Sequence, residues 1–275
     1  MKLLWTLAKK ELRDGLRNRW IAAAIILLGT LALSLSLLGS APTGSVRANN
    51  LDITVISLAS LSVYLIPLIA LMLSFDALVG EFERGTMMLL LTYPVSRWQV
   101  IMGKFLGHLL ILFIAVFAGY GGAIIIMIAL AGGNTEGWQA YGFMMVSSLL
   151  LGAVFISLGY LLSILVKERA TAAGSAIGLW LVFVVLYDLL LFGVLLMDEG
   201  QIISQKLFST LMLFSPTDSY RILNLSLFEG VSQSTGIAGI ASEAGLSSTL
   251  LMSVILLWIV IPLLSTIFIF QRREL

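Results

Sequence analysis

Six apolar stretches, each about 20 residues or longer, constrain this chain more than any other feature. A helix of about 20 apolar residues crosses the roughly 30 Å hydrocarbon core of a bilayer. Only 11% of the residues are charged, against about 25% in soluble domains, which excludes a soluble globular protein. The sequence therefore predicts an all-α integral membrane protein, one transmembrane domain over residues 1–275. The predicted spans are 20–39, 53–79, 101–131, 140–166, 171–197 and 248–270.

Lysine and arginine are unevenly divided between the two sides that six spans define. Thirteen of the sixteen lie in residues 1–19, 80–104, 167–170 and 271–275, all on one side. Basic residues accumulate in cytoplasmic segments of membrane proteins. We therefore expect both termini in the cytoplasm and the segment 198–247 outside. Helical spacing of apolar residues there predicts an amphipathic helix on the outer surface, before the last span, which Pro216 stops.

The first 19 residues are predicted to form an amphipathic elbow helix in the membrane interface. The apolar stretch that follows is longer than that of a signal peptide, so we interpret it as a retained span. Two interpretations stay open, a plain anchor in the lipid interface and a helix that also contacts a cytoplasmic partner. The residues concerned are basic Lys9, Lys10 and Arg13, and Leu12 on the apolar face.

A short apolar helix is predicted between the second and third spans. Thr86 is a candidate N-cap for a helix from 87 to 92, and Pro94 ends it. Ser96 and Gln99 form a capping box that begins the next helix. Such an apolar surface outside a span indicates either a docking site or packing on the membrane or the bundle itself. The candidate contact residues are Glu83, Arg84, Gly85, Thr86, Met87, Met88, Leu89, Leu90, Pro94 and Arg97.

The sequence offers little chemistry of its own. It has no cysteine, one histidine and no G-x-x-x-x-G-K-[ST] motif, so we expect no cofactor, no metal site and no enzyme activity. No basic and aromatic cluster suggests nucleic acid. Among the polar residues within predicted spans, Asp188, Asp76 and His108 are candidates for a functional role. Asp188 is expected to face the bundle interior, Asp76 to reach water, and His108 to make a polar contact.

Two pairs of glycines have the G-x-x-x-G spacing that allows close helix contact, Gly103 with Gly107 and Gly174 with Gly178. Packing within the chain and packing against a second copy are both compatible with this spacing.

The segment with Glu83-Arg84-Gly85-Thr86, Pro94-Val95-Ser96-Arg97 and Gly103-Lys104 resembles the ABC-2 type of ABC transporter permeases. The Lys9-Lys10-Glu11-Leu12 run and the outer segment from Pro216 to Arg221 fit the same pattern. Within that family the sequence is most similar to the permease of a system that matures the copper enzyme nitrous oxide reductase. The resemblance covers essentially the whole chain in layout.

This resemblance implies a permease in the bacterial inner membrane that couples ATP hydrolysis by another subunit to transport, or to work on a partner. It implies two copies of an ATP-binding cassette subunit, a second permease copy, a periplasmic partner protein and membrane lipid as contacts. The elbow helix and the 83–92 helix would be the coupling elements. The alternative is a proton-coupled secondary transporter that uses Asp188 or Asp76.

Overall fold

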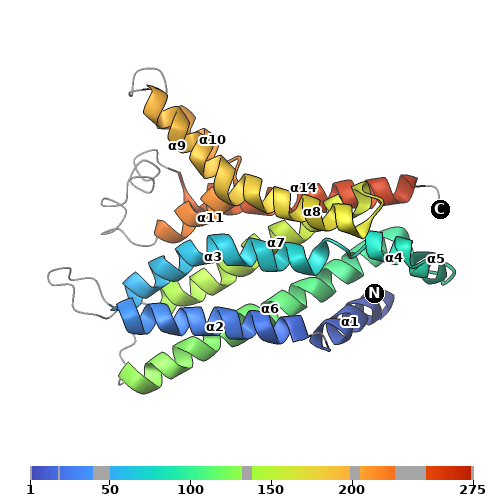
Figure 1. The fold of residues 1–275 in the computed structure, drawn as a ribbon, viewed down its shortest axis with the longest axis horizontal. Coiled ribbons are helices and arrows are strands. Elements are labelled where there is room, and N and C mark those ends of the chain that lie inside the picture. Colours follow the sequence, from blue (N-terminus) through green and yellow to red (C-terminus); the bar gives the residue numbers. More distant parts are fainter. Residues whose placement is uncertain are drawn as a thin grey trace.

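The computed structural model of the protein describes residues 2–17, 19–39, 50–131, 138–198, 205–226 and 246–273. Every regular element in these ranges is helical, which confirms the predicted fold class. Five helices are long and apolar enough to span a membrane. A sixth candidate is the pair α1 (Lys2–Leu16) and α2 (Arg19–Gly39), bent by 70° where the two helices meet. Helix α1 is therefore an elbow beside span α2 (Figure 1).

The remaining spans begin with α3 (Asn50–Ser74), α6 (Arg97–Ala131) and α7 (Trp138–Leu165). The fifth is one helix built from α8 (Arg169–Leu181), the π-helical turn η1 (Val182–Leu186) and α9 (Tyr187–Asp198). The last span is α14 (Ser248–Arg272). Helix α7 is central and packs against α3 and α14, whereas α2 packs against α6. In α7, 72% of the most apolar 18-residue stretch is buried inside the protein. In the helix from α8 to α9 the corresponding share is only 11%, so this helix lies at the periphery of the bundle.

Close approach of small residues lets α7 occupy the centre of the bundle. A Cβ atom at Gly152 would collide with Leu112 of α6, and one at Gly159 would collide with Ser74 at the end of α3. Glycine at these two positions therefore permits the backbones to come nearer than ordinary side chains allow.

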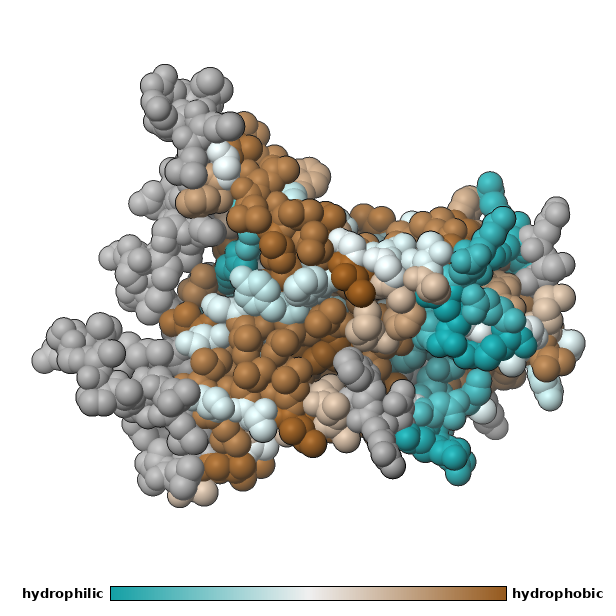
Figure 2. Space-filling model, viewed as in Figure 1, coloured by the Kyte–Doolittle hydropathy of each residue, from teal (hydrophilic) through white to brown (hydrophobic). Residues whose placement is uncertain are grey.

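Short helices lie at the two ends of the bundle. Helices α4 (Val79–Glu83) and α5 (Thr86–Leu91) lie at one end, together with α1 and the end of α14; we call this the α5 end. Helices α10 (Gln205–Met212) and α11 (Pro216–Leu225) belong to the opposite end (Figure 1). Figure 2 shows a hydrophobic belt around the middle of the visible face and a hydrophilic surface over the α5 end.

Three local predictions were tested by these elements. Gly85, with a φ of 69°, precedes the first residue of α5, so Thr86 is not its N-cap as predicted. The Thr86 hydroxyl donates instead to the carbonyl of Glu81 at 3.3 Å. The capping box is confirmed in part, since the Ser96 N–H donates to the Gln99 side chain at 3.2 Å.

The prediction for Pro216 was wrong. Helix α10 ends at Met212, and Pro216 opens a further helix, α11, rather than ending one. Proline is well suited to the first turn of a helix because its missing N–H would have no partner there. Helix α11 was not predicted, and its residues are mostly buried against α7 and α14. The start of the predicted outer helix, before Gln205, lies outside the described residues.

Candidate functional site at the α5 end

Helix α5 presents apolar side chains to its surroundings. Met88 is 51% exposed and Leu89 is 66% exposed, whereas Met87 is fully buried and anchors the helix. Leu90 is half-buried, and Tyr93 just beyond the helix is 67% exposed. The predicted apolar surface is therefore present, although one of its residues serves the core instead.

Helix α4, which precedes α5 and forms its base, is hydrogen-bonded to two spans. The backbone N–H groups of Leu78 and Val79 both donate to the Ser163 hydroxyl of α7, each at 3.0 Å. The Glu83 carboxylate accepts from the N–H of Arg169 at the start of α8, at 2.7 Å. These bonds place α4 and α5 in fixed relation to α7 and α8. A force on α5 would therefore reach both spans directly.

Arg97 ties the beginning of α6 to the end of α14. Its guanidinium donates to three main-chain carbonyls at distances of 2.7, 3.0 and 2.8 Å, those of Phe270, Gln271 and Arg273. The last carbonyls of a helix have no partner within the helix, and a cationic side chain satisfies them well. Pro94 is exposed in the turn that leads from α5 to this position. The segment on both sides of α5 is thus held by spans.

Helix α1 is seated on α6 through one of the two glycine pairs. A Cβ at Gly103 would lie 2.7 Å from the Leu7 Cβ, and one at Gly107 would lie 2.5 Å from the Glu11 Cβ. This pair therefore serves packing within the chain. By contrast, a Cβ at Gly174 or Gly178 would meet no atom of the described chain within 4 Å, so that pair faces open space.

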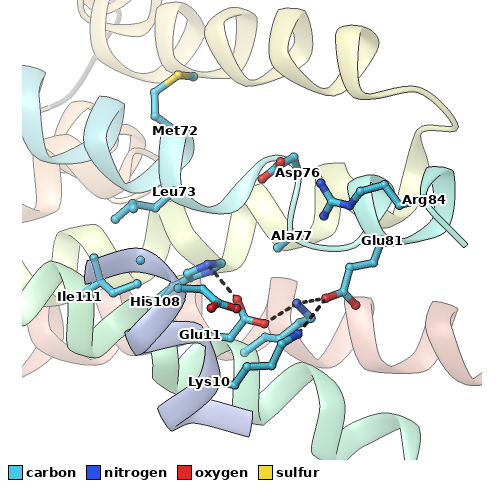
Figure 3. Close-up of a pocket in the computed structure, with 13 residues that line it drawn as sticks. Lys10, Glu11, Met72, Leu73, Asp76, Ala77, Glu81, Arg84, His108 and Ile111 are labelled. Atoms are coloured by element: carbon cyan, nitrogen blue, oxygen red, sulfur yellow. Dashed lines mark hydrogen bonds and ion pairs between the residues drawn. The ribbon is translucent and has the colours of Figure 1, made fainter. Parts of the chain in front are cut away.

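A buried lysine connects α1, α4 and α6. Lys104 Nζ lies 2.7 Å from Glu11 Oε1 and 2.7 Å from Glu81 Oε1, and its side chain is only 3% exposed. Burial raises the pKa of Glu11, but the charge and hydrogen bond of Lys104, together with the charges of His108 and Lys10, lower that pKa overall. Figure 3 shows Lys10, Glu11 and Glu81 converging at this point. One buried cation thereby joins the elbow helix to the base of α5.

Two of the predicted intramembrane polar residues border this cluster. His108 Nδ1 lies 2.8 Å from the Tyr160 hydroxyl, and its Nε2 lies 3.8 Å from Glu11. Asp76 is paired with Arg169 at 2.6 Å rather than left to reach water alone. In the described residues no three histidine, aspartate or glutamate side chains form a group that could hold a metal.

The third residue, Asp188, lies near the opposite end of the bundle. Arg221 of α11 donates to Asp188 at 2.8 Å and to Asp218 at 3.0 Å. Thr217 donates to the carbonyl of Phe183 in η1 at 2.9 Å, so α11 contacts the π-helical turn directly. Burial, aided by the Asp188 charge, raises the pKa of Asp218 to about 7 despite the ion pair with Arg221.

Other predicted residues stand apart from these clusters. Lys9 and Arg13 are exposed on α1, and Leu12 is half-buried. The buried face of α1 is formed by Leu7 and Ala8. Arg84 lies beside α4, and no ion pair found in the described ranges includes it.

Sequence reasoning missed the ion-pair partners of the predicted residues. Glu11, Lys104 and Arg221 belong to the stretches that resemble the family pattern. Glu11 pairs with Lys104 across 93 positions and Asp188 with Arg221 across 33, so neither pair leaves a local pattern in the sequence. The isolated lysine just inside a predicted span was the one available signal, because a buried cation requires acidic partners.

Comparison with known proteins shows the family of the chain. Residues 5–275 match the family described as ABC-2 family transporter protein. The chain is 44% identical over 275 residues to a probable ABC transporter permease protein NosY of Stutzerimonas stutzeri, with 99% of each chain covered. It is 43% identical over 277 residues to the protein of the same description from Pseudomonas aeruginosa, with 100% of each covered. ATP hydrolysis therefore resides in a separate ABC subunit, and this multi-pass membrane protein belongs to the ABC-2 family of transporter permeases.

Proposed function

We propose that this chain is the permease of a NosY-type ABC transporter in the bacterial inner membrane, and that α5 and α1 transmit the movements of two ATP-binding subunits. The observation that carries the proposal is the contrast within α5. Its outward side chains, Met88 and Leu89, are exposed, while its base is bonded to α7 and α8. A subunit bound to the exposed apolar side chains of α5 can therefore transmit its movement through α4 to spans α7 and α8.

The α5 end faces the cytoplasm in this proposal. The basic segments 1–19, 80–104 and 167–170 and the chain end after α14 belong to this end, as the positive-inside rule requires for a cytoplasmic face. The ATP-binding subunits would then meet α1 and α5 together. The Lys104 bridge joins α1 to α4, the helix that leads into α5, since Glu11 and Glu81 share the same cation.

The energy available at α5 is sufficient for coupling. Burial of one Met or Leu side chain contributes about 1.5–3 kcal/mol. Reversal of a two-state equilibrium from 1:99 to 99:1 requires about 5.5 kcal/mol of differential binding. Met88 and Leu89 are 51% and 66% exposed, so their complete burial in two permease copies contributes about 3.5–7 kcal/mol, a range that includes the requirement when only one conformation buries them.

The second permease copy packs on the α8–α9 face in this proposal. That helix is the least buried of the five unbent spans, and Gly174 and Gly178 lie open on it. Small residues at this spacing allow two helices to approach closely in a membrane. Gly174 and Gly178 are therefore available for contact with the second copy, whereas Gly103 and Gly107 pack against α1 within the chain.

The periplasmic end would act on an external partner during maturation of the copper site of nitrous oxide reductase. This finer role follows the resemblance to NosY proteins. The chain contains no cysteine, and its single histidine contacts Tyr160, so it offers no thiolate and no free imidazole for copper. A sulfur species as cargo and mechanical work on the partner both fit these residues.

The coupling role can be tested with Met88→Asp/Leu89→Asp, made in a permease co-expressed with its ATP-binding subunit. We expect loss of co-purification and of permease-stimulated ATP hydrolysis, because each aspartate would have to be desolvated in the interface. Leu165→Asp is the control, since Leu165 is 60% exposed near the same end but lies on α7. Full retention of the subunit and of activity by the double variant would show that α5 is not the coupling helix.

The proton-coupled alternative receives no support from the two aspartates on which it depended. Asp76 is paired with Arg169 and Asp188 with Arg221. Membership of an ABC permease family also places the energy source in another subunit.

A further inference from the structure

Helix α11 packs against four spans at the end opposite to α5: α3, α7, α14 and the fifth span at η1. All four also reach the α5 end (Figure 1). Three of them are interrupted, because Pro67 lies inside α3, Pro262 lies inside α14, and the fifth span contains the π-helical turn. Prolines and π turns are the points at which helices bend. Helix α7 has neither, so it is the stiffest of the four.

At the α5 end, α7 caps helix α4. The first backbone N–H groups of a helix have no acceptor within it, and Leu78, the residue before α4, has no polar side chain to cap them. The buried Ser163 hydroxyl of α7 accepts from the N–H groups of Leu78 and Val79, each at 3.0 Å. A serine 84 positions away therefore takes the place of a local cap, and α4 cannot move without α7 unless these bonds break.

At the opposite end, two adjacent serines of α7 hold α11. Ser148 Oγ lies 2.9 Å from the Tyr220 hydroxyl, and Ser147 donates to Asn224 Oδ1 at 3.0 Å. The side chains of Tyr220 and Asn224 are buried. Burial of a hydroxyl or an amide is costly without a hydrogen bond, so these bonds fix the position of α11 on α7.

The part of α7 between these two contacts is tightly packed. Ser148 and Ser163 lie about 22 Å apart along the axis of an α-helix. Between them Gly152 lies against α6 and Gly159 against the end of α3, so closely that neither position has room for a Cβ atom. Close packing of this kind resists bending. Helix α7 should therefore tilt or slide as one body.

We propose that α7 carries the movement of α5 across the membrane to α11, with Ser163 and Ser148 as the positioning residues at its two ends. The inference rests on the proposed coupling role of α5. Helix α4 displaces Ser163, α7 moves as one body, and Ser147 and Ser148 displace α11. The interruptions in the other three spans let them adjust to this displacement without driving it.

A fluorescent label beside α11 tests the route. Phe214 is 63% exposed and lies two residues before α11, and because the chain has no cysteine, Phe214→Cys gives one labelling site per permease. The labelled permease is reconstituted with a cysteine-free ATP-binding subunit. The signal of an environment-sensitive fluorophore is then compared between ADP and a non-hydrolysable ATP analogue with Mg²⁺. We expect the analogue to change the signal.

Ser163→Ala and the pair Ser147→Ala/Ser148→Ala break the route at its two ends. Each variant should lower the ratio of responding to resting molecules at least about fivefold, the effect of one ordinary hydrogen bond on an equilibrium. Retention of the ATP-binding subunit and the KM for ATP should stay unchanged, which a general loss of structure would not allow. Combination of the three substitutions should lower the response no further, because both breaks lie on one route.

Ser157→Ala is the matched control. Ser157 is a buried serine of the same helix, and its shorter hydrogen bond, at 2.7 Å, goes to the carbonyl of Val154 in α7 itself. This variant should respond to the nucleotide like the unsubstituted complex.

Three results would overturn the route through α7. They are a label that does not respond to the nucleotide, an unchanged response in Ser163→Ala, and losses that multiply in the combined variant, since independent routes add their free energies. A lower melting temperature with an unchanged response would likewise show that the serines serve the fold alone. These results leave the coupling role of α5 standing, because that role is decided separately by subunit retention in Met88→Asp/Leu89→Asp.

Discussion

Replacement of Gly107 by alanine provides a direct test of how the elbow helix is attached. The added Cβ would lie 2.5 Å from the Glu11 Cβ and 3.1 Å from the Ala8 carbonyl oxygen. Carbon atoms in contact are normally about 3.5–4.0 Å apart, so α1 must retreat by roughly 1 Å. The Lys104–Glu11 distance of 2.7 Å would then exceed hydrogen-bonding range. Overpacking of this kind costs about 1–3 kcal/mol.

The assay is thermal unfolding of the purified permease together with ATP hydrolysis in the reconstituted complex. Gly122→Ala is the matched control, because Gly122 lies in the same helix and its Cβ would meet nothing described within 4 Å. Both substitutions gain the same helix preference, up to about 1 kcal/mol, so the difference between them isolates the contact with α1. Gly107→Ala should melt lower and lose coupled hydrolysis. Equal melting temperatures for the two variants would refute the seating of α1 on Gly107.

Three further outcomes are expected. Lys104→Met should destabilise the protein by about 3–5 kcal/mol, since two carboxylates stay buried without their cation, and Glu11→Gln/Glu81→Gln/Lys104→Met should recover much of the loss in the same melting assay. The buried Asp218 carboxyl has its pKa raised from 3.8 to about 7. The folded state therefore binds more protons than the unfolded state between those values, and stability should fall as pH rises through that window. Asp218→Asn should flatten this slope when melting temperatures at pH 5 and pH 8 are compared. Finally, Gly178→Leu should reduce the dimer fraction measured by light scattering in detergent, whereas Gly122→Leu should not.

The spans were predictable because each is an apolar run whose length is set by the bilayer. The short helix α5 was also predictable from turn chemistry, although its cap was not. Gly85 adopts a positive φ that turns the chain from α4 into α5, so Thr86 is already the first residue of α5 and no side chain caps the helix. The local sequence predicts that a turn occurs here, but the same residue types are compatible with several backbone conformations of that turn.

Helix α11 could not be predicted for a different physical reason. Its residues Thr217, Asp218 and Asn224 are polar, so hydropathy places it outside the membrane. Each of these side chains nevertheless finds a partner in the bundle: Phe183 for Thr217, Arg221 for Asp218, and Ser147 for Asn224. Burial of polar groups is acceptable when hydrogen bonds replace water, and those bonds depend on contacts far away in the chain.

The π-helical turn η1 sets the rotational phase of the fifth span. In an uninterrupted α-helix, with about 100° per residue, Asp188 would point only about 40° away from Gly174 and would share its open face. A π turn takes up one extra residue, which rotates everything beyond it by about one residue and turns Asp188 roughly 140° from Gly174. The carboxylate therefore meets Arg221, while apolar Leu189 continues the open face. One extra residue thus lets a single helix present an apolar surface outward and a charge inward.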